Sequence, residues 1–262
     1  MEYKDQLNRT IQLNETPKRI VSLVPSQTEL LVDIGLEDSI VGITKFCVHP
    51  SHLRKFKTVV GGTKQIHVEK IKALKPDIIL CNKEENTKPI IEALQPFAPI
   101  HISDVNNLED AFELIKMYGK IFNVEEKANS IVSIIQKERS HFQNYLKSKP
   151  TLKTAYFIWK KPWMVVASNT FINAMLTEGG FKNVFTKKER YPSIDLDDSN
   201  LKEAEVIFLS SEPYPFKTKH VSKFEEKFPA IKVKIVDGEM FSWYGSRLQK
   251  SFIYFKKVHN KL

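Results

Sequence analysis

The sequence predicts an α/β protein built from two similar Rossmann-like lobes that are joined by a long helix. The first observation behind this prediction is an internal echo, in which Glu69–Cys81 (EKIKALKPDIILC) recurs in altered form as Asp197–Ser210 (DDSNLKEAEVIFLS). In each copy a short amphipathic helix, opened by an acidic residue, leads into a strand that is apolar on both faces, which is typical of a parallel α/β layer. The second observation is the long stretch from Leu108 to Lys147, which has helical apolar spacing and separates the two copies.

The length of the chain supports this division. A chain of 262 residues can form two lobes of ordinary size that each bury a core. A break near Asn123 divides the helical stretch, and the helix after it, about 24 residues long, would span roughly 35 Å. We therefore expect an N-terminal α/β lobe over residues 1–107, a connecting backbone helix over 108–149 and a C-terminal α/β lobe over 150–262, with a ligand cleft between the lobes.

The N-terminal lobe begins with a buried strand at Arg19–Val24. Ser26 and Glu29 have the spacing of a capping box and therefore predict the start of a helix over Gln27–Ile34. Gly35 follows that helix and is a natural residue to end it. The other strands expected in this lobe are Ile40–Ile43, the apolar run Ile78–Leu80 of the first echo copy, and Pro99–Ile102.

The C-terminal lobe follows the same order of elements. Strands at Thr154–Ile158 and Met164–Ala167 flank a loop that carries two tryptophans. Asn169 or Thr170 then caps a helix that stops at a glycine pair. The second echo copy, a strand at Val233–Val236 and a C-terminal helix complete the lobe.

Composition excludes several classes of protein. The chain is 42% hydrophobic and 27% charged, and no apolar stretch approaches the roughly 18 residues needed to cross a membrane, so we expect no direct membrane insertion. The N-terminus, MEYKDQLNRTIQLNE, is polar and has no apolar h-region, so the sequence as written predicts no secretory signal and a cytoplasmic location. The two cysteines are too few for a disulfide framework and do not decide the compartment.

The positive charge of the chain leaves three interpretations open. A net charge of +9 is compatible with an anionic ligand, an acidic partner or a membrane surface. The lysines are scattered through helices and loops, which favours an ordinary solvated surface. There is no tight arginine cluster and no aromatic-basic stripe, so we predict no nucleic-acid partner.

Sequence motifs give no sign of an enzyme. No GxGxxG follows a strand, and no GxxxxGK[ST], GxSxG, CxxC or HExxH is present. We therefore predict no catalytic residue, no required cofactor and no metal site. Cys47 and His49 lie one residue apart in a loop and are the nearest approach to a nucleophile or metal pair. Thiol chemistry and transition-metal binding thus stay open as alternatives.

Aromatic residues in loops give the better signal for a binding site. All three tryptophans fall in loops that follow strands of the C-terminal lobe, where doubly wound sheets place their ligands. Such a pocket suits a flat or apolar ligand with polar edges, and Lys160 and Arg247 are available for carboxylate or phosphate groups. The residues predicted to bind the ligand are Phe46, Cys47, His49, Trp159, Trp163, Glu212, Tyr214, Met240, Phe241, Trp243, Tyr244 and Arg247.

Nearly the whole chain, from about Thr16 onward, resembles a known family. The resemblance is carried by RIVSLVPSQTELLVDIGLEDSIVGIT, by EKIKALKPDIIL and by the run IWKKPWMV…NTFINAML…GG…NVF. These stretches closely resemble the helical-backbone substrate-binding proteins of cobalamin and ferric-siderophore ABC importers. The resemblance implies a monomer that captures a corrinoid or an iron chelate between two lobes, hands it to an ABC permease and works outside the inner membrane.

The same resemblance assigns roles to single residues. Members of the family dock on their permease through one acidic residue per lobe, and the matching positions are Glu69 and Asp197, where the second is more often Glu. Relative to the cobalamin binder, Thr63 and Met240 stand in place of tryptophans and Ser242 in place of a glutamate. These departures imply a site that serves a different or differently posed ligand.

The sequence therefore favours a substrate-binding protein of an ABC importer that is not an enzyme. The first alternative is a cytoplasmic small-molecule binding or sensing protein on the same fold without a transporter. The second is an enzyme that uses Cys47 and His49, and the third is a transition-metal receptor.

Overall fold

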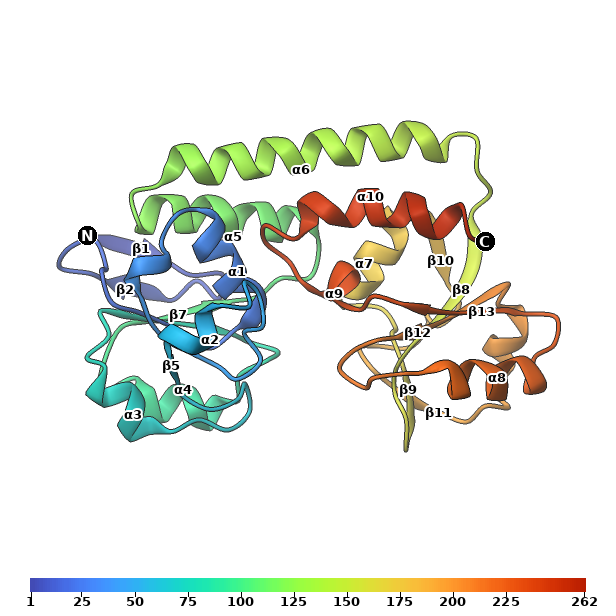
Figure 1. Cartoon of the computed structure of the whole chain (residues 1–262), viewed down its shortest axis with the longest axis horizontal. Coiled ribbons are helices and arrows are strands. Elements are labelled where there is room, and N and C mark those ends of the chain that lie inside the picture. Colours follow the sequence, from blue (N-terminus) through green and yellow to red (C-terminus); the bar gives the residue numbers. More distant parts are fainter. The chain divides into compact units, whose positions relative to one another are not determined.

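The computed structural model describes all residues from Met1 to Leu262 and divides into two α/β units (Figure 1). Unit 1 comprises Met1–Val105, Glu109–Ile135 and Tyr244–Arg247, and unit 2 comprises Asn106–Leu108, Gln136–Trp243 and Leu248–Leu262. Each unit holds its own sheet, which confirms the predicted fold class of two α/β lobes. Unit 1 is built from three segments of the chain, and the last of them, Tyr244–Arg247, returns to it late in the sequence.

Unit 1 contains a five-stranded parallel sheet in the order β5-β4-β3-β6-β7. β6 is buried at every position, as expected of a strand in a parallel sheet that is covered on both faces. The strands are β3 (Ile20–Ser22), β4 (Ile40–Ile43), β5 (Thr58–Val59), β6 (Ile78–Asn82) and β7 (Ile100–Ser103), with a separate hairpin of β1 (Glu2–Lys4) and β2 (Thr10–Gln12). The helices are α1 (Pro25–Asp33), η1 (Glu37–Ser39), α2 (Leu53–Phe56), α3 (Val68–Ala73), α4 (Lys88–Leu94) and α5 (Leu108–Ile121).

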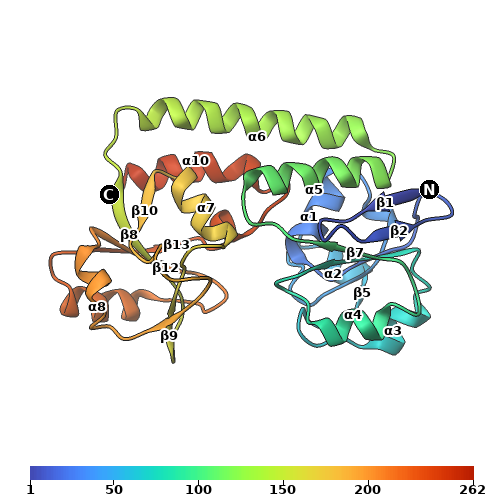
Figure 2. The ribbon, with the colours of Figure 1, turned by 180° about the vertical axis from the view of Figure 1, so that it is seen from behind.

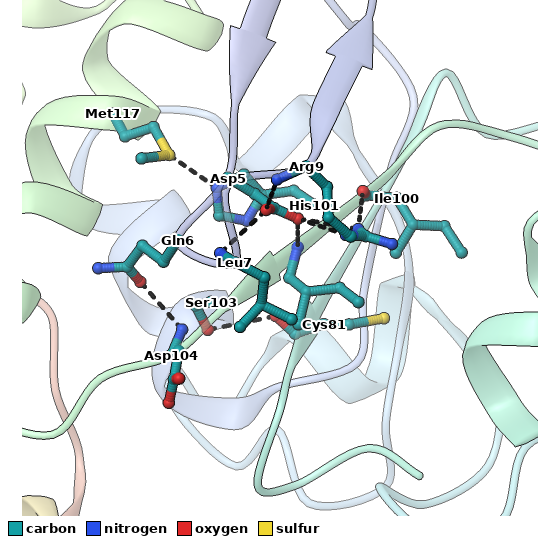
Figure 3. A network of polar contacts seen from close by, with 11 residues as sticks. Asp5, Gln6, Leu7, Arg9, Cys81, Ile100, His101, Ser103, Asp104 and Met117 are labelled. Atoms are coloured by element: carbon teal, nitrogen blue, oxygen red, sulfur yellow. Dashed lines mark hydrogen bonds and ion pairs between the residues drawn. The ribbon is translucent and has the colours of Figure 1, made fainter. Parts of the chain in front are cut away.

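A buried aspartate fastens the N-terminal hairpin to the edge of this sheet (Figure 3). The Asp5 carboxylate accepts hydrogen bonds from the backbone amides of Leu7 and Arg9, both 3.0 Å long, and from the amide of Ile102 in β7 at 3.1 Å. The Arg9 guanidinium donates to Asp5 at 2.9 Å and to the carbonyl of Ile100 at 2.7 Å. The hairpin thereby covers polar backbone groups of an edge strand that would otherwise be open to pairing.

The predicted start of α1 is wrong in its detail. The N-cap residue is Val24, no side chain caps the helix, and Pro25 occupies the first turn. Ser26 and Glu29 therefore form no capping box, and the Glu29 carboxylate bonds to Arg247 instead. Proline has a fixed φ that suits the first helical position and lacks the N–H that would need a partner there, so it begins the helix without a cap.

Unit 2 contains a mixed sheet in the order β11-β9-β8-β12-β13, and β10 also pairs with β8. β8, β10, β12 and β13 run parallel to one another, whereas β9 is antiparallel to both β8 and β11. The strands are β8 (Leu152–Trp159), β9 (Trp163–Val165), β10 (Phe181–Asn183), β11 (Ser193–Ile194), β12 (Val206–Ser210) and β13 (Lys232–Val236). The helices are α7 (Phe171–Glu178), η2 (Ser199–Glu203), α8 (Thr218–Lys227), α9 (Glu239–Ser242) and α10 (Leu248–His259). The predicted cap of α7 is confirmed, because Thr170 Oγ1 accepts from the amide of Asn173 at 3.2 Å.

The long helix α6 (Glu125–Leu146) runs from unit 1 into unit 2, as Figure 2 shows from behind. Its residues up to Ile135 belong to unit 1 and the rest to unit 2. The predicted break before it lies at Asn123, whose φ of 56° is left-handed. In unit 2, Arg139 holds α6 to α7 through two hydrogen bonds to Glu178, 2.8 and 2.6 Å long. None of the helices is both long and apolar enough to cross a membrane.

The internal echo corresponds to a repeated backbone arrangement. At the end of the first copy, Asp77 donates its amide to the carbonyl of Arg19 at 2.8 Å and accepts from the amides of Lys18 and Arg19 at 2.8 and 2.9 Å. At the end of the second copy, Glu205 donates its amide to the carbonyl of Lys153 and accepts from the amide of Lys153, both at 2.8 Å. Each acidic residue thus ties the echo strand, β6 or β12, to the start of its parallel neighbour, β3 or β8.

The helices of the two copies differ. Glu69 lies in the first turn of α3, as expected. In the second copy the helix is the short 3₁₀ turn η2, whose N-cap is Asp198, which accepts from the amide of Asn200 at 3.0 Å. The expectation that Asp197 opens this helix is wrong by one position, so the Asp197 carboxylate is available for other contacts.

Candidate functional site

Four aromatic rings gather where β8 and β12 end in unit 2. These strands are adjacent and parallel, so the segments that follow them meet at one edge of the sheet. The ring centroids of Trp159 and Tyr214 are 5.7 Å apart, and those of Tyr214 and Phe216 are 4.8 Å apart. Phe216 stacks on Trp163 at 6.3 Å with an angle of 9° between the rings. We call Trp159, Trp163, Tyr214 and Phe216 the aromatic cluster.

The aromatic cluster reaches from the core to the surface. Phe216 is buried, and the half-buried Trp163 has edge-on contacts with Phe157 at 6.0 Å and with Phe224 at 5.2 Å. Trp159 lies at the other end and keeps 39% of its surface exposed. The cluster is therefore fixed by packing in the core, and Trp159 presents apolar ring surface to solvent.

A histidine at the start of α8 supports the cluster. His220 is buried, and its Nδ1 accepts the amide hydrogen of Lys217 at 2.9 Å. In the neutral ring the other nitrogen, Nε2, therefore carries the proton, and it lies 3.4 Å from the hydroxyl oxygen of Tyr214. Burial lowers the pKa of His220, and the positive charges of Lys160 and Lys219 lower it further. A neutral imidazole consequently fixes the position of the Tyr214 ring.

A second group of predicted residues meets around Glu212. Its Oε1 accepts hydrogen bonds from the hydroxyl of Ser242 at 2.8 Å and from the indole nitrogen of Trp243 at 3.1 Å. Gly238 makes this approach possible, since a Cβ there would lie 2.6 Å from the Glu212 side chain. Burial raises the pKa of Glu212, an effect that the hydrogen bond from Ser242 partly opposes and the charge of Glu239 reinforces.

Two of the predicted contact residues in this part of unit 2 are buried. Phe241 is fully buried, with its ring centroid 5.1 Å from that of Tyr156 and 4.7 Å from that of Phe255. Trp243 is only 7% exposed, and its indole nitrogen is bonded to a side chain of its own unit. Met240 is half-buried. The prediction that Phe241 lines a pocket conflicts with its place in the core, because helix α9 turns that side chain inward.

Tyr244 and Arg247 lie inside unit 1. Gln27 lies at the centre of a buried group, in which its amide oxygen accepts from the hydroxyl of Tyr118 at 2.6 Å and its amide nitrogen donates to that of Tyr244 at 3.3 Å. The guanidinium of Arg247 donates to both carboxylate oxygens of Glu29 at 2.8 Å. The expectation that Arg247 binds an anionic ligand group is corrected by this ion pair, because a carboxylate of the protein already holds the guanidinium.

The predicted residues of the N-terminal lobe separate into exposed and buried positions. Phe46 is 49% exposed and His49 is half-buried. Cys47 is fully buried, and its sulfur lies 3.1 and 3.3 Å from the hydroxyls of Thr28 and Thr44. Burial raises the pKa of the Cys47 thiol, which keeps it protonated and unsuited to nucleophilic or metal chemistry. No group of three or more His, Cys, Asp or Glu side chains is arranged to hold a metal ion.

Comparison with known proteins identifies the family. A family model described as "Periplasmic binding protein" matches residues 20–232. The chain belongs to this family. It is 29% identical over 189 residues to the uncharacterized ABC transporter substrate-binding lipoprotein YvrC of Bacillus subtilis, a match that covers 68% of this chain and 59% of that protein. It is 26% identical over 231 residues to the vitamin B12-binding protein of Vibrio vulnificus, covering 85% of this chain and 82% of that protein.

The fold of this periplasmic binding protein also matches solved structures. A periplasmic heme-binding protein from Pseudomonas aeruginosa superposes with a TM-score of 0.79 at 20% identity, over 93% of this chain and 92% of the other. The similarity confirms the class of two lobes with a bridging helix. Because the family consists of non-catalytic binding proteins, membership also confirms the prediction that the chain is not an enzyme.

The two acidic residues expected to dock a permease are on the surface of this periplasmic binding protein, one in each unit. Glu69 is exposed in the first turn of α3 in unit 1. Asp197 is exposed in unit 2 and accepts a hydrogen bond from Lys227 at 2.7 Å, which lowers the pKa of Asp197. The position of Lys227 could not be read from the sequence, since it lies 30 residues away on α8.

Sequence reasoning named Lys160 but missed His220 and the lysines of α8 beside the aromatic cluster. The available signal was the spacing at the start of α8, where Phe216, His220 and Phe224 recur every four residues and are all buried. Lys219 and Lys223 have the same spacing on the exposed side of α8. Together, the buried set Phe216, His220 and Phe224 and the exposed lysines Lys219 and Lys223 would have predicted a basic surface next to the aromatic loops.

Proposed function

We propose that this periplasmic binding protein is the substrate-binding component of an ABC importer and that it captures a corrinoid or an iron chelate. The observation that carries the proposal is the aromatic cluster, where an exposed Trp159 continues into rings held in the core. Relatives whose names specify vitamin B12 or heme support a large, flat metal chelate as the ligand. An ABC transporter lipoprotein among the relatives supports a permease as the partner.

The ligand contacts fall on side chains with accessible surface. In unit 2 these are Trp159, Trp163 and Tyr214, and the half-buried Met240 of α9 is a fourth candidate. In unit 1 the candidate is Phe46, which presents nearly half of its surface. Phe241, Tyr244 and Arg247 instead support the folded units, because their side chains are enclosed by neighbours.

In this proposal, Glu69 and Asp197 dock the protein on the permease so that the ligand can be transferred. Both carboxylates are exposed, and each lies in the segment that precedes the echo strand of its unit. Exposed carboxylates on separate units suit pairing with two arginine sites of a permease. The mechanism then consists of binding, docking and release, without a covalent step.

Isothermal titration calorimetry against cobalamin, cobinamide, heme and a panel of ferric siderophores tests the proposal. We expect saturable binding of one class, and Trp159→Ala should weaken it roughly tenfold because the ring supplies exposed contact area. Ile235→Ala serves as the matched control, since Ile235 is another exposed apolar side chain of unit 2 at 41%. Absence of saturable binding to every compound would contradict the proposal.

A further inference from the structure

Lysines surround the aromatic cluster of unit 2. The Lys160 ammonium lies 5.9 Å from the ring centroid of Trp163, and that of Lys223 lies 5.6 Å from the same ring. Lys217 and Lys219 stand at the start of α8, on either side of the residue Thr218. Their charges act on His220 together with that of Lys160. Two cationic side chains therefore lie over Trp163, and two more act on His220, whose ring contacts Tyr214 and Phe216.

This positive charge is not neutralised within the protein. The ion pairs of unit 2 use other lysines, namely Lys153 with Glu203, Lys188 with Asp198 and Lys227 with Asp197. None of the four lysines at the cluster has a carboxylate within ion-pairing distance. Burial and the neighbouring lysines lower the pKa of His220, which disfavours a further positive charge on its ring.

Cation–π contact alone does not account for four lysines. One or two ammonium groups above Trp163 gain roughly 0.5–1 kcal/mol at an exposed site, but further like charges around the same ring repel one another. An anionic partner removes this repulsion and accepts charge-assisted hydrogen bonds. A ligand whose edge carries only neutral amides gains neither effect.

We infer that the aromatic cluster and its four lysines select a metal chelate that has an aromatic surface and anionic oxygen groups at its edge. This inference rests on the proposed function and narrows its substrate class. Two kinds of compound supply this chemistry: metalloporphyrins with free carboxylates, and ferric complexes of catecholates. Neutral corrinoids, whose peripheral carboxyl groups are amides, are disfavoured. The aromatic face lies against Trp159 and Tyr214, and the anionic groups meet the ammonium groups of Lys160, Lys219 and Lys223.

A matched pair of ligands tests the charge requirement. Zinc protoporphyrin and its dimethyl ester share one ring and differ in two negative charges, and cyanocobalamin and a ferric tris-catecholate complete the set. We expect at least one anionic probe to bind, and we expect zinc protoporphyrin, where it binds, to do so about tenfold or more tightly than its diester. Raising the salt concentration should weaken binding of the anionic probes. Comparing the affinity for zinc protoporphyrin with that for the ferric tris-catecholate shows which of the two kinds of compound the protein prefers.

Lysine variants assign the effect to this surface. The triple substitution Lys160→Gln, Lys219→Gln and Lys223→Gln should raise the Kd of the anionic probe about tenfold and reduce the salt dependence. The triple control Lys182→Gln, Lys187→Gln and Lys234→Gln removes the same charge from exposed positions of unit 2 that touch none of the cluster rings, and it should leave the Kd within about twofold.

The outcomes distinguish this inference from the proposed function. Binding of cyanocobalamin or of the diester as tightly as the anionic probes, or an unchanged Kd in the first triple variant, overturns the charge requirement and leaves the importer function standing. Failure of all probes to bind overturns both. Measuring the melting temperature of each triple variant separates a lost contact from a lost fold, and all six lysines are exposed or half-exposed.

Discussion

Arg247 donates one hydrogen bond to each carboxylate oxygen of Glu29, both 2.8 Å long, although 218 residues separate the two in the sequence. The pair is buried, with 6% and 8% of the side-chain surfaces exposed. It holds the segment Tyr244–Arg247 within unit 1 while the residues on both sides belong to unit 2. Gly245, with a φ of 103°, allows the backbone to turn at this point. The chain is thus anchored in unit 1 by a contact near its end.

Breaking this pair should cost more stability than any surface substitution. We expect Arg247→Met to lower the free energy of unfolding by about 3–5 kcal/mol, because it leaves the Glu29 carboxylate buried without its partner. The double variant Glu29→Met with Arg247→Met should recover much of the loss, since replacing both charges removes the desolvation cost. Urea denaturation followed by circular dichroism measures each value.

An exposed ion pair provides the control for that experiment. Lys88 and Glu92 on α4 lie 3.7 Å apart, with 87% and 60% of their side chains exposed. Lys88→Met should change the free energy of unfolding by less than about 1 kcal/mol. If Lys88→Met and Arg247→Met lowered the free energy of unfolding equally, the buried pair would stabilise the fold no more than an exposed pair does.

Stability should fall in acid because of His101. This histidine is fully buried in β7, and its Nε2 lies 2.9 Å from the sulfur of Met117 (Figure 3). Its ring packs edge-on against Tyr118. Burial lowers the pKa of His101 from 6.5 to about 4. Between these two values the unfolded chain binds a proton that the folded chain excludes, so stability is lost as the pH falls from 6.5 to 4.

The variant His101→Phe isolates this contribution. Relative to the variant, the wild-type protein should lose up to about 3 kcal/mol of unfolding free energy between pH 7 and pH 4. Phenylalanine keeps the edge contact with Tyr118 and cannot be protonated. The exposed His141 on α6, changed to Phe, controls for the added phenyl group. A constant difference between wild type and His101→Phe across this pH range would contradict the prediction.

Glu212 should have the opposite pH dependence to His101, lowering the stability of the protein as the pH rises. Burial raises its pKa, so the folded chain holds this proton to a higher pH than the unfolded chain does. Ionisation therefore penalises the fold as the pH rises past 4.5, and the penalty persists at pH 8. Glu212→Gln keeps an oxygen that can accept from Ser242 and Trp243 but removes the charge.

We accordingly expect Glu212→Gln to be more stable than the wild-type protein at pH 8 and equal to it at pH 4. Thermal melts over this range measure the difference. Glu205→Gln is the contrasting variant, since the Glu205 carboxylate accepts from a backbone amide at an exposed position. A Glu212→Gln protein that is less stable at both pH values would show that the carboxylate charge supports the fold.

Docking on a permease should depend on Glu69 and Asp197 without affecting ligand affinity. The experiment measures ATP hydrolysis by the cognate permease in proteoliposomes as the binding protein is added. We expect Glu69→Ala and Asp197→Ala each to raise about tenfold the concentration of binding protein that gives half-maximal stimulation. The Kd for the ligand should stay within about twofold, because neither side chain belongs to the aromatic cluster.

Lys227 gives this experiment a second direction. Its ammonium donates to the Asp197 carboxylate at 2.7 Å, and in the proposed docking a permease arginine would have to displace it. Lys227→Gln should therefore strengthen docking, whereas Glu92→Ala, which removes an exposed carboxylate from α4, should leave it unchanged. If both Glu69→Ala and Asp197→Ala stimulated ATP hydrolysis at the same half-maximal concentration as the wild-type protein, neither residue would belong to the docking surface.

Much of the fold could be read from local patterns. The apolar runs at Ile78–Leu80 and Val206–Leu209 are buried strands, and the break at Asn123 precedes the long helix. The capping box at Ser26 and Glu29 was misread because its spacing is also compatible with a proline-started helix. A spacing pattern does not reveal which distant partner competes for a side chain.

The candidate site was predictable in part for the same reason. Trp159 ends β8, Trp163 begins the next strand, and Tyr214 follows β12, the parallel neighbour of β8, so topology brings them together. Phe241 was misplaced because a short helix decides whether its side chain faces the core, and loop sequence does not encode that direction. His220, Lys219 and Lys223 were missed because their spacing on α8 indicates a functional role only once the folded chain places α8 beside the aromatic cluster.

The sequence by itself determined two α/β units and a long connecting helix, since burial of apolar runs and helical spacing are local consequences of side-chain type. The family was indicated separately, by the resemblance of whole motifs to known binding proteins. Only the tertiary structure decided that Tyr244 meets Gln27 and that Arg247 meets Glu29, over separations of 217 and 218 residues. Hydrogen bonds and ion pairs require atoms within about 3 Å, and such proximity is a property of the folded chain.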